Sequence, residues 1–135
     1  MITYRVGGPL DLDEVTELYR ASTLGERRPV DEAVRMEAML RHANLTVTAW
    51  EGPLLVGIAR SLSDFLYVTY LADLAVRLSH QRQGIGRELI AATRREAPQA
   101  MIVLLAAPKA VDYYPRIGFS RHDSAWVLRP EANIR

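Results

Sequence analysis

A glycine-rich turn, Gln81-Arg82-Gln83-Gly84-Ile85-Gly86, carries the residues whose spacing most directly suggests chemistry. It follows a short apolar run at residues 70–76 and precedes a segment of helical composition. The first N–H groups of a helix lack internal partners, and the helix dipole adds a partial positive charge there. Glycine lets a phosphate approach the backbone without a Cβ in the way. The turn therefore fits a pyrophosphate.

Two familiar nucleotide-binding patterns do not match this turn. A dinucleotide fingerprint needs a third glycine, and that position is Leu89. A P-loop needs Gly-Lys followed by serine or threonine, which is missing here. A phosphate- or nucleotide-binding protein of another kind stays open, because glycines also close turns that bind nothing.

The fuller segment is more specific than the turn alone. Leu74-Ala75-Val76, a polar link, Gln-x-x-Gly-x-Gly and an amphipathic helix resemble the acetyl-CoA motif of the GNAT N-acetyltransferase superfamily. Downstream, Ala110-x-x-Tyr113-Tyr114 leading to Ile117-Gly118-Phe119 resembles that superfamily's second signature. With the flanking elements, the resemblance covers nearly the whole chain. It implies an acetyl-CoA-dependent N-acetyltransferase (EC 2.3.1 class) that moves an acetyl group to a primary amine by direct attack on the thioester.

The resemblance also implies roles for individual residues. The backbone N–H of Leu74 is expected to polarise the thioester carbonyl, and Tyr114 to protonate the leaving thiolate, with Tyr113 as a packing residue. Arg82 and Arg87 are candidate charged contacts to the pyrophosphate. The expected cofactor-binding residues are Leu74, Ala75, Val76, Gln81, Arg82, Gln83, Gly84, Ile85, Gly86 and Arg87.

Two positions depart from the family's pattern. Ala107 stands where the family often has an asparagine that contacts the cofactor, so one side-chain contact is missing. Pro115 stands in place of the usual charged residue after the tyrosine, and it bears on where Tyr114 points. Neither change removes the pyrophosphate turn.

A general base is not evident from the sequence. A protonated amine must lose a proton, and Asp73 on the central strand is one candidate, with Asp64 as another. His80 and His122 are expected to be structural. No histidine and carboxylate show metal-ligand spacing, so no metal is predicted. Glu26-Arg27-Arg28 is expected to be a solvated charge cluster in the loop at residues 22–29, which the resemblance places beside the acceptor.

Composition limits the classes of protein that need to be considered. With 135 residues, the chain is expected to form a single GNAT domain, residues 1–135. A formal net charge of +1 gives no electrostatic case for a nucleic-acid or membrane partner. The chain has no cysteine, which excludes disulfides and thiolate sites. Without a signal-peptide core or a long apolar run, a cytoplasmic protein is expected.

Hydrophobic periodicity predicts the elements that must position these residues. Strands are predicted at residues 2–6, 45–50, 54–62, 70–76 and 101–106, and a final hairpin at 119–128. Helices are predicted to start near Asp11, near Asp31, after Gly86 and at Pro108, the last ending at once before Pro115. The resemblance implies an α/β fold: a twisted mixed sheet with helices on both faces, splayed between its fourth and fifth strands, which are 70–76 and 101–106 here.

Three functions are consistent with these observations. The first is an acetyl-CoA-dependent N-acetyltransferase acting on a small-molecule or peptide amine, and a homodimer is not excluded. The second is a non-catalytic acyl-CoA-binding regulatory module of the same fold, which would not need Tyr114. The third is the phosphate- or nucleotide-binding protein mentioned above. The sequence does not identify the acceptor.

Overall fold

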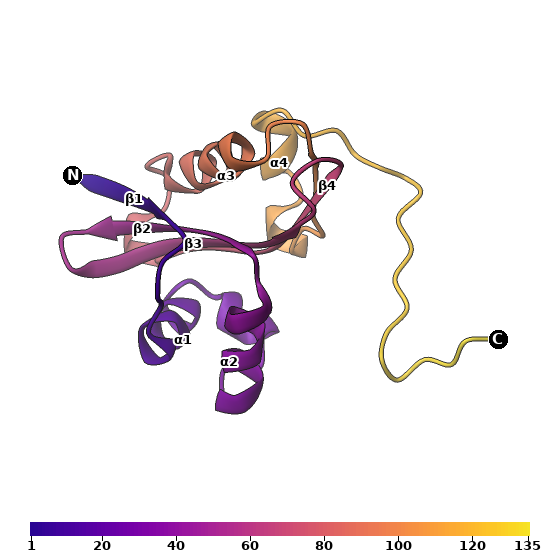
Figure 1. Ribbon diagram of the computed structural model, residues 1–135, viewed down its shortest axis with the longest axis horizontal. Helices are drawn as coiled ribbons and strands as arrows, with labels where there is room; N and C mark the ends of the chain where they lie inside the picture. The colour runs from indigo at the N-terminus through magenta and orange to yellow at the C-terminus, as the bar shows by residue number, and fades with distance from the viewer. The chain divides into compact units, whose positions relative to one another are not determined.

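A computed structural model describes all residues, 1–135, as two compact units, Met1–Leu105 and Ala106–Arg135 (Figure 1). The elements of the first unit are β1 (Ile2–Val6), α1 (Leu12–Ala21), η1 (Leu24–Arg27), α2 (Ala33–His42), β2 (Leu45–Glu51), β3 (Leu54–Ser63), β4 (Val68–Val76), η2 (Leu78–His80), α3 (Ile85–Glu96) and β5 (Met101–Val103). Those of the second unit are η3 (Pro108–Ala110) and α4 (Tyr113–Arg116), where η marks a short 3₁₀ helix.

The first unit is built on a five-stranded sheet in the order β1-β2-β3-β4-β5. The first three pairings are antiparallel, and β4 pairs with β5 in parallel. Helices α1 and α2 lie on one face and α3 on the other (Figure 1). The predicted α/β fold with a mixed sheet is thereby confirmed.

Helix α1 shows how the sequence builds the core. Asp11 caps its first turn by accepting a hydrogen bond from the N–H of Glu14 at 3.1 Å, in agreement with the predicted start of a helix near Asp11. Its apolar stripe, Val15, Leu18 and Tyr19, has no exposed surface. This stripe packs against the sheet residues Trp50, Leu55, Ile58 and Ala75.

Helix α3 covers the opposite face and fixes the position of the glycine-rich turn that precedes it. Ile85 and Leu89 are buried on its inner side. Gly57 of β3 lies beneath them, and a Cβ at that position would come within 3.0 Å of Leu89 Cδ1. The missing side chain at Gly57 therefore allows the start of α3 to pack closely on the sheet.

Strands β4 and β5 pair over only a short stretch. The register joins Val68 to Met101 and continues to Tyr70 and Val103, whereas β4 runs on to Val76. The sheet therefore opens beyond Tyr70, which is the predicted splay between the fourth and fifth strands. The fifth strand is shorter than the predicted strand at 101–106, because β5 ends at Val103, and Met101 is half exposed.

The second unit differs from the prediction in two ways. No strand forms at residues 119–128, and Trp126 is almost fully exposed. An alternating pattern favours a strand but does not supply a partner edge. Pro115 also does not end the helix before Tyr114, because α4 includes both residues. Proline is tolerated in a first helical turn, where its missing N–H would have no intrahelical partner.

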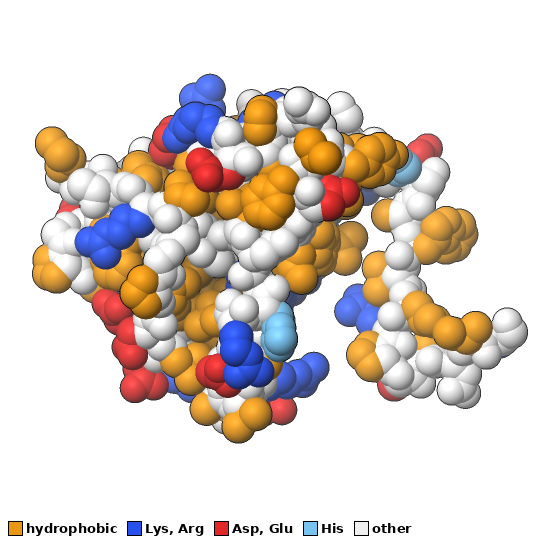
Figure 2. Space-filling view, viewed as in Figure 1, with side chains coloured by type: hydrophobic (Ala, Val, Ile, Leu, Met, Phe, Trp, Pro, Cys, Tyr) orange, Lys and Arg blue, Asp and Glu red, His pale blue; other side chains and the backbone are white.

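Charged side chains of both signs are interspersed on the face shown in Figure 2, as the small net charge suggests. None of the helices combines the length and the apolar character that crossing a bilayer requires.

Candidate active site

The glycine-rich turn ends in the N-terminus of α3. Gly84 is the N-cap, with φ of +82°, and no side chain caps the helix. The helix starts at Ile85, so the N–H groups of Ile85, Gly86 and Arg87 have no acceptor within it. Three backbone donors and the positive end of the helix dipole therefore point out of the first turn, as an anion site requires.

The space in front of the turn is open. A Cβ built on Gly84 would meet no atom within 4 Å, and Arg82, Gln83 and Arg87 are exposed. The side-chain amide of Gln81 donates to the carbonyl of Val76 at 3.0 Å. This hydrogen bond ties the turn to the end of β4.

His80 supports the same turn from the other side. Its Nδ1 lies 2.7 Å from Ser79 Oγ and its Nε2 lies 3.1 Å from Glu51 Oε1, at the end of β2. Its side chain is largely buried. These contacts fit the structural role predicted for this histidine.

The end of β4 presents backbone groups at an open edge. Arg77 donates its N–H to the carbonyl of Val56 on β3 at 2.8 Å. Backbone groups alternate in direction along an antiparallel ladder, so those of Ala75 face β3 whereas those of Leu74 and Val76 face away from it. Because β5 pairs with β4 only as far as Tyr70, these outward groups lie where the sheet has opened.

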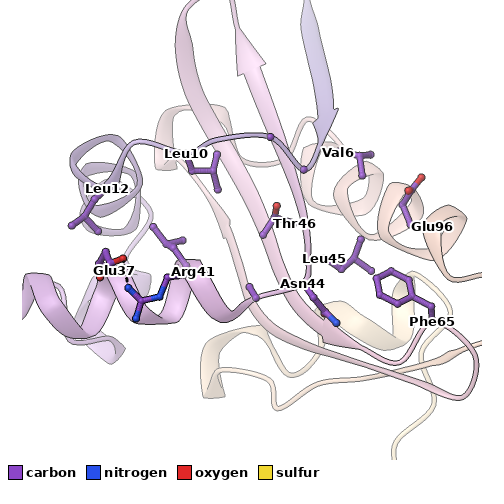
Figure 3. Close-up of a pocket in the computed structure, with 14 residues that line it drawn as sticks. Val6, Leu10, Leu12, Glu37, Arg41, Asn44, Leu45, Thr46, Phe65 and Glu96 are labelled. Atoms are coloured by element: carbon purple, nitrogen blue, oxygen red, sulfur yellow. Dashed lines mark hydrogen bonds and ion pairs between the residues drawn. The ribbon is translucent and has the colours of Figure 1, made fainter.

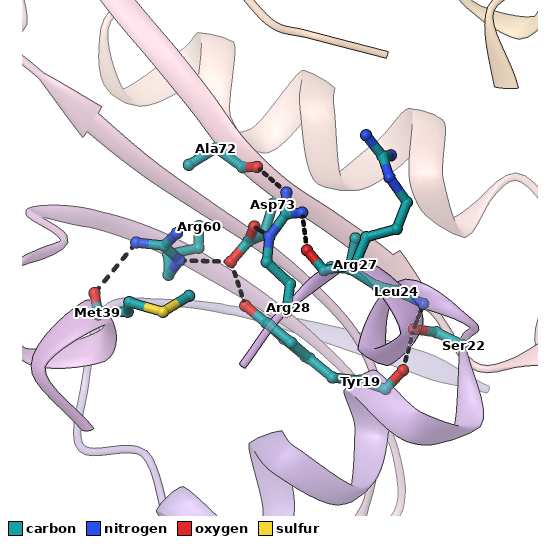
Figure 4. A network of polar contacts seen from close by, with 9 residues as sticks. All are labelled: Tyr19, Ser22, Leu24, Arg27, Arg28, Met39, Arg60, Ala72 and Asp73. Carbon is teal, nitrogen blue, oxygen red and sulfur yellow. Dashed lines mark hydrogen bonds and ion pairs between the residues drawn. The ribbon is translucent and has the colours of Figure 1, made fainter. Parts of the chain in front are cut away.

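Asp73 is fully buried and accepts three hydrogen bonds, each 2.6 Å long (Figure 4). Its Oδ2 receives the hydroxyl of Tyr19 and Nε of Arg60, and its Oδ1 receives Nε of Arg28. Burial alone would raise the pKa of this carboxyl. The hydrogen bonds from Arg60 and Tyr19 and the charges of both arginines outweigh it, so the pKa of Asp73 is lowered.

These contacts argue against Asp73 as a general base. A base should have a pKa near the working pH and a lone pair directed at the substrate. Asp73 has a lowered pKa and both oxygens occupied by protein donors. Asp64 is no better suited, because its Oδ1 accepts the N–H groups of Leu66, Tyr67 and Val68 and these hydrogen bonds lower its pKa.

The expectation that Glu26, Arg27 and Arg28 form a solvated charge cluster is wrong for Arg28. The side chain of Arg28 is 23% exposed and donates to Asp73, to the carbonyl of Ala72 and to the carbonyl of Arg27. Its charge therefore faces a buried carboxylate and is not free for a substrate. Tyr19 and Arg60 were not singled out from the sequence, where they look like ordinary core and strand residues.

Tyr114 belongs to the second unit and lies in an aromatic cluster there. Its ring makes edge-to-face contacts with Tyr113 and Phe119, at centroid distances of 5.3 and 5.4 Å. Burial, with a smaller contribution from Tyr113, raises the pKa of the Tyr114 hydroxyl above its ordinary value of about 10. The phenol therefore stays protonated throughout the neutral pH range.

A pocket of about 610 Å³ lies at the other end of the sheet (Figure 3). Its walls come from the end of β1, the end of α2 and the start of β2, with Phe65 and Glu96 at its border. The glycine-rich turn instead follows the end of β4, which pairs with the start of β3. The pocket is therefore separate from the turn and from Leu74.

Comparisons with known proteins point to one family. The family model described as an acetyltransferase (GNAT) domain matches residues 19–128. A curated relative from Prochlorococcus marinus, named as an uncharacterised N-acetyltransferase, is 29% identical; the match covers 92% of this chain and 67% of that protein.

Experimental structures show the same fold. A GNAT family acetyltransferase from Streptococcus pneumoniae is 27% identical, with a TM-score of 0.73 and coverage of 96% of this chain and 99% of that one. An aminoglycoside N-acetyltransferase solved with CoA is 17% identical, with a TM-score of 0.74 and coverage of 98% and 96%. The second likeness concerns the fold alone.

Proposed function

Because the chain belongs to the GNAT acetyltransferase family and is an acetyl-CoA-dependent N-acetyltransferase, we propose that it acetylates a primary amine of a small molecule or peptide by direct attack on the thioester. The amine nitrogen forms a bond to the carbonyl carbon, the carbon–sulfur bond breaks, and the thiolate of CoA gains a proton while the amine loses one. Residues 1–135 act as one catalytic domain, which the match at residues 19–128 supports because it includes parts of both units.

The observation that carries the proposal is the uncapped N-terminus of α3 behind Gly84. The N–H groups of Ile85, Gly86 and Arg87 are directed at the pyrophosphate of the cofactor, and the open space at Gly84 admits it. Arg82 and Arg87, both exposed, add positive charge at the turn. The remaining contacts of the turn come from Gln83 and from the backbone at Gln81.

The thioester is placed along the open edge of β4. The backbone N–H of Leu74 faces away from β3, so it is free to donate to the carbonyl oxygen as negative charge develops there. The outward N–H of Val76 suits the pantetheine arm, because the carbonyl of Val76 already accepts from Gln81. Ala75 contributes packing because its backbone groups face β3. A backbone donor needs little reorganisation during the reaction.

Tyr114 is proposed to assist departure of the thiolate. Its raised pKa exceeds that of a thiol, about 8.5, so full transfer of its proton to a free thiolate is uphill. Its contribution is therefore a hydrogen bond that strengthens as charge builds on the sulfur. We propose that water, rather than Asp73, accepts the proton of the amine, because both carboxylate oxygens of Asp73 are occupied.

The test is an acceptor panel in which release of free thiol from acetyl-CoA is followed. Polyamines, amino acids, lysine peptides and an aminoglycoside form the panel, the last because one structural neighbour carries that name. The absence of cysteine means that the protein itself contributes no thiol to the signal. Thiol release above the rate of uncatalysed hydrolysis supports catalysis. Tight acetyl-CoA binding with no release for any amine would favour the regulatory module. A cytoplasmic location stays a prediction.

A further inference from the structure

Strand β4 contains a β-bulge two residues before Leu74. In its ladder with β3, Leu71 pairs with Ser61 and Asp73 pairs with Arg60, so Ala72 is the extra residue. An extra residue is left unpaired in the ladder, and its backbone groups need other partners. The carbonyl of Ala72 finds one in Nη2 of Arg28, at 2.9 Å.

The same guanidinium also binds the carboxylate of the next residue. Arg28 Nε donates to Oδ1 of Asp73 at 2.6 Å, the oxygen that Tyr19 and Arg60 leave free (Figure 4). The planar guanidinium thus contacts two consecutive residues of β4 through fixed donors. Asp73 keeps Arg60 and Tyr19 as partners if Arg28 is lost.

The side chain of Arg28 also connects the loop at residues 22–29 to β4 of the sheet through hydrogen bonds. The other hydrogen bonds of residues 24–28 are local: the N–H of Leu24 donates to Ser22 Oγ, the N–H of Glu26 to the carbonyl of Thr23, and the N–H of Val30 to the carbonyl of Arg28. None of them reaches β4. The neighbouring Arg27 contributes only its backbone carbonyl, which accepts from Arg28 Nη1 at 2.8 Å.

We propose that Arg28 is a positioning residue for acetyl transfer. It holds the bulge at Ala72 and Asp73 from outside the sheet, and thereby fixes the direction of the Leu74 N–H two residues later. This inference rests on the proposed function, in which that N–H meets the thioester. Arg28 touches neither cofactor nor amine in this proposal, and its effect passes through the backbone of β4.

The test compares Arg28→Ala with Arg27→Ala by hydrogen exchange and mass spectrometry. The two variants lose the same charge in the same loop, but only the first loses contacts with β4. Without ligand, amide exchange over residues 22–29 and 71–76 should rise about tenfold in Arg28→Ala and remain as in the native protein in Arg27→Ala. Ethylguanidinium at millimolar concentration should restore the protection in Arg28→Ala.

A second measurement adds acetyl-CoA. Calorimetry should give Arg28→Ala an affinity within about threefold of the native protein, because the turn at residues 81–87 is untouched. The bound cofactor should nevertheless protect residues 72–76 clearly less in this variant. Equal exchange in the two variants, or full protection by acetyl-CoA in Arg28→Ala, overturns the positioning role. Failure of the native protein to bind acetyl-CoA would overturn the proposed function, while exchange without ligand still decides whether Arg28 holds the bulge.

Discussion

Gly84 has a backbone conformation that favours glycine, and it borders an open space. Its φ of +82° is unfavourable for residues with a Cβ, and the site of that Cβ faces empty space. In Gly84→Val, a branched side chain would stand where the pyrophosphate is proposed to bind. We expect acetyl-CoA affinity, measured by calorimetry, to fall at least about tenfold, which is about 1.4 kcal/mol.

Gly52→Val is the matched control for this change. Gly52, in the turn between β2 and β3, also has a positive φ, of +55°, and open space at its Cβ. Both variants should therefore lose a similar stability of about 1–2 kcal/mol from backbone strain. Only Gly84→Val should lose affinity, and an equal loss in both variants would mean that strain, rather than occupation of the phosphate site, is responsible.

Tyr114→Phe isolates the hydroxyl proposed to assist the thiolate. The ring contacts with Tyr113 and Phe119 are kept, so the melting temperature and the cofactor affinity should change little. The single-turnover rate of thiol release should fall about 100-fold, the loss typical of removing one hydrogen-bond donor to developing negative charge. Because burial raises the pKa of Tyr114, the hydroxyl is protonated below about pH 10, and the native rate should show no alkaline loss from this group up to that pH.

Tyr113→Phe supplies the comparison for that experiment. It removes one hydroxyl from the same short helix, α4, and leaves the proposed donor in place. A full rate in Tyr114→Phe together with a slow Tyr113→Phe would assign the role to the other tyrosine. Full rates in both would mean that neither hydroxyl assists departure of the thiolate.

At the scale of elements, Asp73 joins parts of the fold that are distant in the sequence. It binds α1 through Tyr19, the loop after η1 through Arg28 and β3 through Arg60. Arg60 extends the network by donating to the carbonyl of Met39 in α2 at 3.1 Å. In Asp73→Asn, Arg28 and Arg60 lose their buried carboxylate partner. The free energy of unfolding at neutral pH should therefore fall by about 3–5 kcal/mol.

The pH dependence of that difference follows from the direction of the pKa shift. The pKa of Asp73 is lower in the folded protein than in the unfolded chain, where it is about 3.9. Its stabilisation is therefore fully present above pH 4 to 5 and is lost as the pH falls through the folded value. Urea unfolding should show the gap between native protein and Asp73→Asn to be constant from pH 5 to 7 and smaller near pH 3. A gap that widens in acid would contradict the ionised role.

Local sequence patterns predicted most of the helices and strands. They failed where formation of a strand depends on pairing with a segment that is distant in the sequence. The alternation around Val47 and the turn at Gly52 were sufficient to predict the hairpin of β2 and β3, because both strands lie next to each other in the chain. A similar pattern near Trp126 predicted a hairpin that does not form. The pattern of side chains contains no information about whether a sheet edge is available.

In the candidate site too, the local part could be predicted from the sequence, and the part formed by distant residues could not. The turn at Gly84 could be predicted, because its function comes from consecutive residues at a helix start. The environment of Asp73 could not, since its partners Arg60, Arg28 and Tyr19 are 13, 45 and 54 residues away in the sequence. A carboxylate on a strand can be a base or a buried anchor, and only these distant contacts distinguish the two.

At the scale of the whole molecule, cofactor binding should raise the free energy of unfolding. A ligand present at 100 times its dissociation constant stabilises the folded state by about 2.7 kcal/mol. For a chain of this size, we expect the melting temperature to rise by about 10 °C in saturating acetyl-CoA. NAD and ATP should give almost no shift, and a comparable shift with either would favour a general nucleotide-binding protein.

The bulge at Ala72 also changes which face of the sheet receives the buried side chains of β4. Residues 69, 71, 73 and 75 are all buried, and in a regular strand they would share one face. The register instead pairs Leu71 with Ser61 and Asp73 with the adjacent Arg60, so the side chains of Leu71 and Asp73 lie on opposite faces. Asp73 meets Tyr19 of α1, whereas Leu71 lies on the face of the sheet where Gly57 packs against α3. A single strand thereby contributes buried side chains to the layers on both sides of the sheet.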